Sequence, residues 1–273
     1  MRHNTTVVNR FINFLRTLFQ RRSLILEMAK RDISAQYKNS MLGFLWTFIH
    51  PIIMIFVMWL VFSIGFRVLP VGDVPFVIWI TASLAIWNTF TEVVSNATES
   101  IIGNVHLVKK IVFPLSILAI VKLVGSFITH GIFLLILISL ILFHGMPSSL
   151  YWIQALYYFC AMSVLALGLS WITSSVNIFA RDTSQIVRVI LQIGFWGTPI
   201  FWDLAIMPPK AQFILKLNPM FYIVQGYRDS FIYAVPFWEH WQMTLYFWAI
   251  TGFIFVLGSM IFVRLRPHFA DVL

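Results

Sequence analysis

The sequence has little charge, and the charge it has is mostly of one sign. Only 11% of the 273 residues are charged, with 10 Asp and Glu against 19 Lys and Arg. A water-soluble domain of this length needs far more polar surface to cover its core, so the composition excludes a soluble globular protein. The basic residues lie beside apolar segments and do not form a patch that could line a groove, which argues against nucleic-acid binding.

Several chemical motifs are missing. Cys160 is the only cysteine, which leaves no intrachain disulfide and no thiolate metal site. The histidines show no i, i+4 pairing and no Glu-x-x-His pattern, so we expect no metal site. No Lys follows a Gly, which excludes a nucleotide-binding phosphate loop in this chain. No Gly-x-Ser-x-Gly elbow and no pair of intramembrane acids occurs. We therefore predict neither a catalytic residue nor a cofactor in this chain.

Long apolar runs make up most of the sequence, which is 60% hydrophobic. They predict an all-α polytopic membrane protein with six transmembrane helices. The expected spans are residues 39–66, 76–95, 114–143, 150–179, 186–202 and 240–263. The apolar part of the fifth, 189–202, is only about 21 Å long as a helix and contains Gly194, Gly197 and Pro199. We expect it to span incompletely or to end in a broken helix.

The segments outside the spans have their own patterns. Residues 1–38 are expected on the cytoplasmic side, with a basic amphipathic interface helix at 7–22 and a second short helix at 24–38. Packing of the first helix on a soluble partner is the alternative. The polar connection 96–113 predicts a short helix outside the bilayer. Residues 203–238 alternate helix breakers with aromatics, which indicates short re-entrant or surface helices before the last span.

The distribution of Lys and Arg predicts the orientation. Six crossings place both termini on one side, and most of the basic residues fall there. Those expected on the other side are Arg67, Lys210, Lys216 and Arg228. The excess predicts a multi-pass membrane protein with both termini in the cytoplasm. The region 203–238 is then on the outer side.

Two features have more than one interpretation. Lys122 is the only Lys or Arg inside the apolar part of an expected span. Three interpretations stay open: its amine meets a phosphate, pairs with Glu92, or extends to the near membrane surface. The tryptophans near the span ends form an interfacial belt, or the aromatics of 203–238 line the exit of a glycan, since sugar rings stack on aromatic faces.

Four ordered motifs carry a resemblance to a known family. The first runs from Arg31-Asp32-Ile33 through Tyr37-Lys38-Asn39-Ser40 to Leu45-Trp46 and Pro51. The others are Leu107-Val108-Lys109-Lys110 with Phe113-Pro114, then Asn177 to Asp182, then Leu217-Asn218-Pro219 with Gly226-Tyr227-Arg228. Together they resemble the ABC type-2 permeases that export polysaccharides such as O-antigen and teichoic acid. The resemblance covers nearly the whole chain but does not identify the glycan.

The resemblance implies roles for particular residues. Residues 28–38 resemble a gate helix at which a lipid-linked pyrophosphate enters, with Arg31, Tyr37 and Lys38 as contacts; anchoring by the same basic residues is the alternative. Residues 98–107, with a second contact near 181–185, resemble a coupling helix that docks on an ATPase. The implied coupling residues are Glu99, Ile102, His106, Lys109, Arg181 and Asp182. Residues 204–232 resemble outer gate helices, and the expected aromatic path contains Trp202, Phe221, Tyr222 and Tyr227.

The expected function follows from these parts. The resemblance implies a homodimeric permease in the cytoplasmic (inner) membrane of a bacterium, joined to two copies of an ABC ATPase subunit that binds ATP and Mg. The expected partners of this chain are a lipid-linked glycan, which it moves, and membrane lipids. The placement of the basic residues argues against nucleic acid as a partner. An ABC permease for a drug or a lipid is the nearest alternative. An ATPase-independent channel or carrier needs intramembrane ionisable groups or an internal repeat, and neither is evident. A membrane glycosyltransferase needs an acid-rich catalytic loop, which the longest loop lacks.

Overall fold

A computed structural model of the chain describes residues 20–36, 40–67, 74–108 and 113–273. Within these ranges the chain is helical and contains no strand. The helices in chain order are α2 (Arg22–Gln36), α3 (Trp46–Trp59), α4 (Phe76–Glu99), α5 (Val105–Val108), α6 (Ile117–Phe143), α7 (Gln154–Phe179), α8 (Thr183–Gly197), α9 (Pro209–Lys216), α10 (Pro219–Arg228), α11 (Trp241–Leu265) and α12 (Phe269–Val272). The predicted interface helix at 7–22 lies largely outside the described residues.

Short 3-10 and π segments join these helices. They are η1 (Gly43–Leu45), η2 (Leu60–Gly65), η3 (Ile102–Asn104), η4 (Leu150–Ile153), η5 (Leu204–Ile206), η6 (Asp229–Tyr233), η7 (Phe237–His240) and η8 (Arg266–His268). With them, five helical segments are long and apolar enough to cross a membrane: Gly43–Gly65, Phe76–Glu99, Ile117–Phe143, Leu150–Phe179 and Phe237–Val272. The chain is therefore an all-α polytopic membrane protein.

Helix α8 is the remaining segment of the six that the sequence predicts. Its 15 residues extend about 22 Å, which is short of the ~30 Å hydrocarbon core. The backbone becomes extended at Thr198, and Pro199 follows directly. The helix thus ends where the glycine and proline pattern predicts a break, and a sixth complete span stays a prediction.

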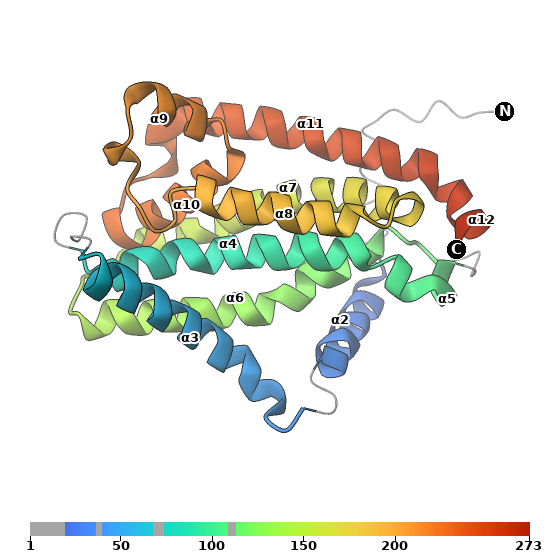
Figure 1. Cartoon of the computed structure of the whole chain (residues 1–273), viewed down its shortest axis with the longest axis horizontal. Helices are drawn as coiled ribbons and strands as arrows, with labels where there is room; N and C mark the ends of the chain where they lie inside the picture. Colours follow the sequence, from blue (N-terminus) through green and yellow to red (C-terminus); the bar gives the residue numbers. More distant parts are fainter. Residues whose placement is uncertain (1–19, 37–39, 68–73, 109–112) are drawn as a thin grey trace.

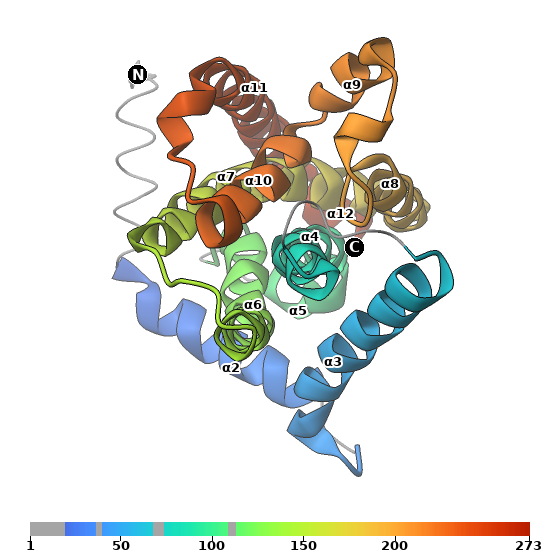
Figure 2. The same ribbon diagram turned by 90° about the vertical axis from the view of Figure 1, so that its left-hand side faces the viewer.

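Helix α4 forms the centre of the bundle (Figure 2). In the most apolar 18-residue stretch of its span 78% of the residues are buried, and its most extensive neighbours are α6 and α7. Hydroxyl groups inside this apolar core bond to carbonyls one turn earlier on the same helix: Thr81 to Val77 at 2.6 Å and Thr89 to Ala85 at 2.7 Å. These bonds satisfy the polar groups where no water reaches them.

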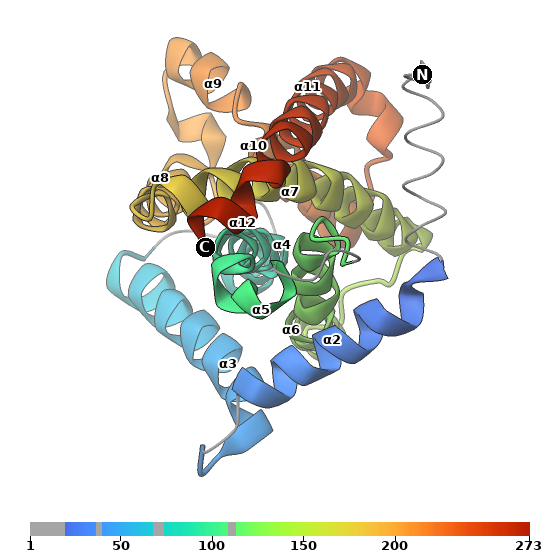
Figure 3. The ribbon, with the colours of Figure 1, turned by 90° about the vertical axis from the view of Figure 1, so that its right-hand side faces the viewer.

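Helix α3 lies apart from this core. Only 11% of the span that contains it is buried, although its residues are apolar on all sides. Its C-terminal end lies near the start of α4, and its N-terminal end points away from the bundle (Figures 1 and 3). Helix α2 lies beside the N-terminal end of α3 and packs against α6 (Figure 3). Pro51 is inside this helix.

The two ends of the bundle differ. We call the end with α2, α5 and α12 the α2 end, and the end with α9 and α10 the α10 end (Figure 1). The segment 98–107 lies at the α2 end as the close of α4, then η3 and α5. The segment 203–238 lies at the opposite end, and α9 and α10 are the pair of short helices that the sequence predicts there.

Candidate functional site

Helix α2 packs on α6 through one apolar face that also carries an acid. Ile25, Met28 and Ala29 are buried at helical spacing, and Asp32 follows one turn later on the same face. The Asp32 carboxylate accepts a hydrogen bond from the Lys122 ammonium group at 2.5 Å, with the side chains 27% and 21% exposed. Because an unpaired charge at this depth is costly, the ion pair stabilises the contact between α2 and α6.

The sequence did not identify this pair. The partners that the sequence suggested for the Lys122 amine were Glu92, a phosphate and the membrane surface. In the structure its partner is Asp32. A signal for it was present, since Asp32 continues the i, i+3, i+4 series of the apolar residues on α2. An acid on the buried face of a helix needs a partner, but the pattern alone cannot say which helix provides it.

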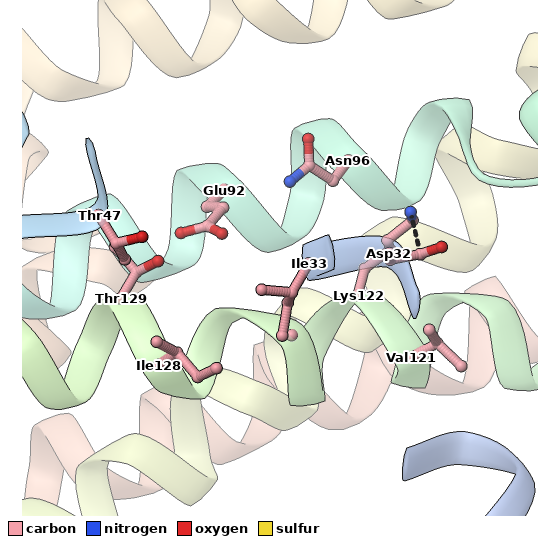
Figure 4. Close-up of a pocket in the computed structure, with 10 residues that line it drawn as sticks. Asp32, Ile33, Thr47, Glu92, Asn96, Val121, Lys122, Ile128 and Thr129 are labelled. Carbon is pink, nitrogen blue, oxygen red and sulfur yellow. Dashed lines mark hydrogen bonds and ion pairs between the residues drawn. The ribbon is translucent and has the colours of Figure 1, made fainter. Parts of the chain in front are cut away.

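A cavity of about 300 Å³ opens beside this ion pair, between α2, α3, α4 and α6. Its lining residues are Asp32, Ile33, Thr47, Glu92, Asn96, Val121, Lys122, Gly125, Ile128 and Thr129. In Figure 4 the Glu92 carboxyl lies beside Thr129 and Thr47, with Asn96 next to it, while Lys122 and Asp32 lie at the other end. Lys122 and Thr129 are about 10 Å apart along α6. The polar lining thus extends from one end of the bundle toward its middle.

Such a cavity has few possible contents. Acyl chains are poor neighbours for carboxyl, amide and ammonium groups, because burying those groups in hydrocarbon costs free energy. Polar residues inside membrane bundles face water-filled cavities or substrate pathways. The cavity is therefore the candidate site at the α2 end.

The predicted pyrophosphate contacts lie outside this cavity. Arg31 is exposed on the surface of α2, next to Asp32 in the chain but not among the lining residues. Tyr37 and Lys38 lie outside the described residues. Contact of these three residues with a phosphate stays a prediction.

The predicted coupling residues gather at the α2 end. Glu99 is the last residue of α4, and its Oε1 accepts a hydrogen bond from Arg188 of α8 at 2.8 Å. Both side chains are half exposed, so solvent weakens this ion pair. The other predicted contacts comprise a half-buried Ile102 and an exposed His106, Arg181 and Asp182. Lys109 lies outside the described residues.

Asn177 connects three helices at this end. Its Nδ2 donates to the Thr98 carbonyl of α4 at 3.1 Å, and its Oδ1 accepts from the Ser184 backbone amide of α8 at 3.2 Å. The residue is on α7 and is 2% exposed. Asn177 belongs to the third family motif, and the sequence predicted no role for it. The structure shows that it joins the ends of α4, α7 and α8.

The α10 end has a comparable connection. Asn218 caps α10, because its side chain accepts from the Met220 amide at 3.0 Å and donates to the Thr198 hydroxyl at 2.8 Å. Arg228, at the end of α10, donates to the carbonyls of Pro199 at 2.7 Å and Ile200 at 2.9 Å. These groups follow the break of α8, where helical partners are missing. Helix α10 is thus bonded to the C-terminal end of α8.

Arg228 is also stacked on an aromatic ring. The guanidinium carbon lies 3.4 Å from the ring centroid of Trp79, and the residue is 2% exposed. A planar guanidinium is suited to this combination of stacking and carbonyl bonding, and a lysine is not. The sequence placed Arg228 on the outer side and in the fourth family motif, and it predicted neither the stacking nor the carbonyl bonds.

Asp229 follows Arg228 and is buried as well. It accepts a hydrogen bond from Gln225 at 2.9 Å, and its Oδ2 lies 3.4 Å from Nε2 of His240. Burial raises the pKa of the Asp229 carboxyl, while the Gln225 hydrogen bond and the charges of His240 and Arg228 lower it.

The aromatic residues predicted for an outer path are mostly buried within this chain. The Tyr227 hydroxyl is 3.1 Å from Nε2 of His130, and the Tyr222 hydroxyl is 2.9 Å from the Thr244 hydroxyl. Phe221 borders a second cavity of about 210 Å³ together with Trp79 and Arg228, and Trp202 is half-buried. Tyr222 and Tyr227 therefore hold α10 in the bundle, and their part in a glycan path stays a prediction.

No group of three or more His, Cys, Asp or Glu side chains gathers within 20–36, 40–67, 74–108 and 113–273 in a way that could hold a metal ion.

Comparison with known proteins finds one matching family and several relatives. The family described as ABC-2 type transporter matches residues 23–232. An "O-antigen export system permease protein RfbA" of Klebsiella pneumoniae is 28% identical over 253 residues, which cover 92% of this chain and 95% of the relative. A protein of the same name from Myxococcus xanthus is 26% identical over 265 residues, 95% of this chain and 99% of the relative. The family match extends from α2 to η6 and so includes both ends of the bundle.

Proposed function

The chain belongs to the ABC-2 type transporter family, and from this premise we propose that it is the membrane permease subunit of an exporter of O-antigen-like polysaccharide. The observation that carries the proposal is the end-to-end similarity to O-antigen export permeases, over 92% of this chain and 95% of the relative. The cargo is a lipid-linked glycan, which crosses the membrane without a bond being made or broken in this chain.

The geometry supports this function in two places. A cavity with polar walls lies beside α2 at one end of the bundle, where a lipid-linked cargo enters from the side. At the other end, α9 and α10 are short helices bonded to the break of α8. Between them, α8 is held at its start by Asn177 and at its end by Arg228. A displacement of the α2 end can therefore reach the α10 end through one helix.

The energy source is an ABC ATPase subunit that docks on the α2 end. In our proposal two copies of the ATPase bind ATP and Mg, and they contact Glu99, Ile102, His106, Lys109, Arg181 and Asp182. The exposed side chains among them are accessible for such contacts. Domain closure in the ATPase moves the segment 98–107 and with it the helices that Asn177 joins.

A second copy of this chain completes the conduit. Helix α3 exposes Ile52, Ile53 and Phe56, and α8 exposes Ile190 and Ile193, so both present apolar faces that the single chain leaves uncovered. Lipid covers such faces in part, and a homodimer covers the rest. The location in this proposal is a bacterial cytoplasmic membrane, which the bacterial relatives support. The distribution of Lys and Arg supports an orientation with both termini in the cytoplasm.

Reconstitution tests the proposal. We would co-purify the chain with candidate ABC ATPases, insert the complex into proteoliposomes, and measure ATP hydrolysis and movement of lipid-linked O-antigen. We expect hydrolysis to rise with the lipid-linked glycan and the glycan to cross only with ATP. The double variant Glu99→Ala with Lys109→Ala should insert normally but lose the link between hydrolysis and export. Lys210→Ala, at the α10 end, is its control.

Three outcomes of the reconstitution would contradict parts of the proposal. Glycan movement by the purified chain without any ATPase would make it a channel or a carrier. Stimulation by a drug or an ordinary membrane lipid, with no response to the glycan, would make it an ABC permease for another cargo. Normal export by the Glu99 and Lys109 variant would remove the coupling role of these residues.

A further inference from the structure

The cavity between α2, α3, α4 and α6 has a charge balance that selects among ligands. Among the described residues that line it, the only cation is Lys122, and the acids are Asp32 and Glu92. Asp32 already pairs with the lysine at 2.5 Å. Within the described lining, a diphosphate in this cavity would therefore meet no uncompensated positive charge and at least one carboxyl group. Anion binding needs the reverse, namely uncompensated cations or free backbone amides.

The remaining polar groups suit a neutral ligand with several hydroxyls. The Glu92 carboxyl accepts hydrogen bonds, the Asn96 amide both donates and accepts, and the Thr129 hydroxyl does either. Ile33 and Ile128 add apolar contact area of the kind that the C–H faces of a sugar ring pack against. Buried polar groups discriminate strongly between a ligand that pairs with them and one that does not.

The size of the cavity limits the ligand to one ring. A volume of about 300 Å³ is at the lower end of the range for small-molecule sites, roughly 300–1,000 Å³. Asn96 and Ile128 are exposed at its rim, so a ring attached to a lipid can enter from the side. The volume matches one sugar of a polysaccharide chain and not several.

From these observations we propose that the cavity binds one uncharged sugar ring of the lipid-linked cargo, namely the sugar next to the diphosphate, and does not bind the diphosphate itself. The proposal rests on the function proposed above. It assigns recognition of the sugar to Glu92, Asn96 and Thr129, and it leaves the diphosphate to contacts outside the cavity. The ion pair of Asp32 and Lys122 then holds α2 as one wall of the site.

Gly125 offers a test that changes the space inside the cavity. A Cβ atom at Gly125 would meet no heavy atom within 4 Å, and the residue lines the cavity. Gly131 is on the same helix, is equally unobstructed, and does not line the cavity. Gly125→Leu should therefore fill the cavity, and Gly131→Leu is its matched control.

The measurement is the affinity of the full-length chain in nanodiscs for two probes. One is a short polyprenyl diphosphate that carries a single hexose, and the other is the same diphosphate without sugar. We expect the wild type to bind the hexose probe about tenfold more tightly, the effect of one or two net hydrogen bonds. Gly125→Leu should lose this preference and keep its affinity for the sugar-free probe, and Gly131→Leu should behave as the wild type.

A second pair of variants tests the chemistry of the site. Thr129→Val keeps the shape and removes a hydroxyl from the cavity, so it should reduce the preference about threefold or more. Thr81→Val is its control, because the Thr81 hydroxyl bonds only to the Val77 carbonyl of its own helix. If Gly125→Leu does not fold, Thr129→Val and its control still test whether the cavity binds the sugar.

Three results would overturn the inference. They are equal binding of both probes by the wild type, an equal loss of both probes in Gly125→Leu, and an unchanged preference in both cavity variants. The proposed function is judged separately by ATP-dependent glycan movement in the wild type. A wild type that exports glycan but shows no preference for the hexose probe refutes only the sugar site.

Discussion

The charged side chains inside this bundle are held by specific partners. Lys122 pairs with Asp32, and the guanidinium of Arg228 bonds to two backbone carbonyls and stacks on Trp79. Asp32 and Trp79 belong to other helices, and the two carbonyls directly follow α8, so each charged residue also fixes the position of one helix on another. Burying these charges costs free energy, but their bonds form only in one arrangement of the helices and so favour that arrangement.

Exchange of the Asp32–Lys122 pair tests this at a single contact. Lys122→Ala leaves a partly buried Asp32 without its cation, and we expect it to lower the free energy of unfolding by about 1 kcal/mol, between the values for exposed and buried pairs. The double variant Asp32→Lys with Lys122→Asp restores opposite charges at the same place and should recover most of this loss. Thermal unfolding of the purified chain in detergent measures both.

Lys210→Ala provides the reference for this series. Lys210 is exposed on α9, far from α2, and its loss should leave the unfolding temperature unchanged. If the exchanged double variant were as unstable as Lys122→Ala, the two side chains would not be acting as a pair.

At the scale of whole helices, glycines set the closest approach in the bundle. Helices α7 and α11 make the most extensive contact of any pair in the described chain. A Cβ atom at Gly258 of α11 would lie 2.2 Å from the carbonyl oxygen of Gly168 in α7. The obstacle is backbone, which cannot move aside as a side chain can. Small residues at such a crossing allow the helices to pack backbone to backbone.

The glycine contact gives a prediction with a control on the same helix. Gly258→Ala should force α7 and α11 apart and lower the free energy of unfolding by roughly 1–3 kcal/mol. Gly252→Ala should be neutral or slightly stabilising, because no heavy atom lies within 4 Å of its new Cβ and alanine is the better helix former. Thermal unfolding of both variants in detergent makes the comparison, and equal stability of the two would contradict the close crossing.

Most helices could be predicted from the sequence, but their pairings could not. The predicted helix at 24–38 corresponds to α2 at Arg22–Gln36, and the breakers in 203–238 predict α9 and α10. Local patterns contain that information, because spacing and proline act on neighbouring residues. The contacts of Lys122 with Asp32 and of Asn177 with Thr98 join residues 90 and 79 positions apart. Such contacts depend on how helices pack, and one sequence does not encode them in a local pattern.

For the molecule as a whole, the arrangement has two distinct ends joined by α8. At the α2 end, the first two turns of α8 bond to Asn177 and Glu99. At the α10 end, Arg228 donates hydrogen bonds to the carbonyls that directly follow α8. An exporter driven from one side needs such a connection, since the ATPase and the exit are on opposite faces of the membrane. The orientation of the bundle therefore decides whether the proposed mechanism is possible.

Cysteine labelling tests that orientation. We would replace Cys160, the single native cysteine, with serine and then introduce one cysteine, either Lys210→Cys in α9 or His106→Cys in α5. Both positions are exposed, and they lie at opposite ends of the bundle (Figure 1). Because basic residues concentrate at the side of the termini, we expect α5 in the cytoplasm and α9 outside. A membrane-impermeant maleimide should label Lys210→Cys in intact cells and His106→Cys only after permeabilisation.

The opposite labelling pattern would mean that the protein has the reverse orientation in the membrane. The α2 end would then face away from the cytoplasm, where ATP is available, and an ATPase could not dock on the segment 98–107. Labelling of both cysteines in intact cells would place the two ends on one face and contradict the spanning arrangement of α4, whose 24 residues extend about 36 Å from the α10 end to the α2 end. The expected pattern puts the cavity beside α2 on the side where a lipid-linked glycan and ATP meet, which the proposed export requires.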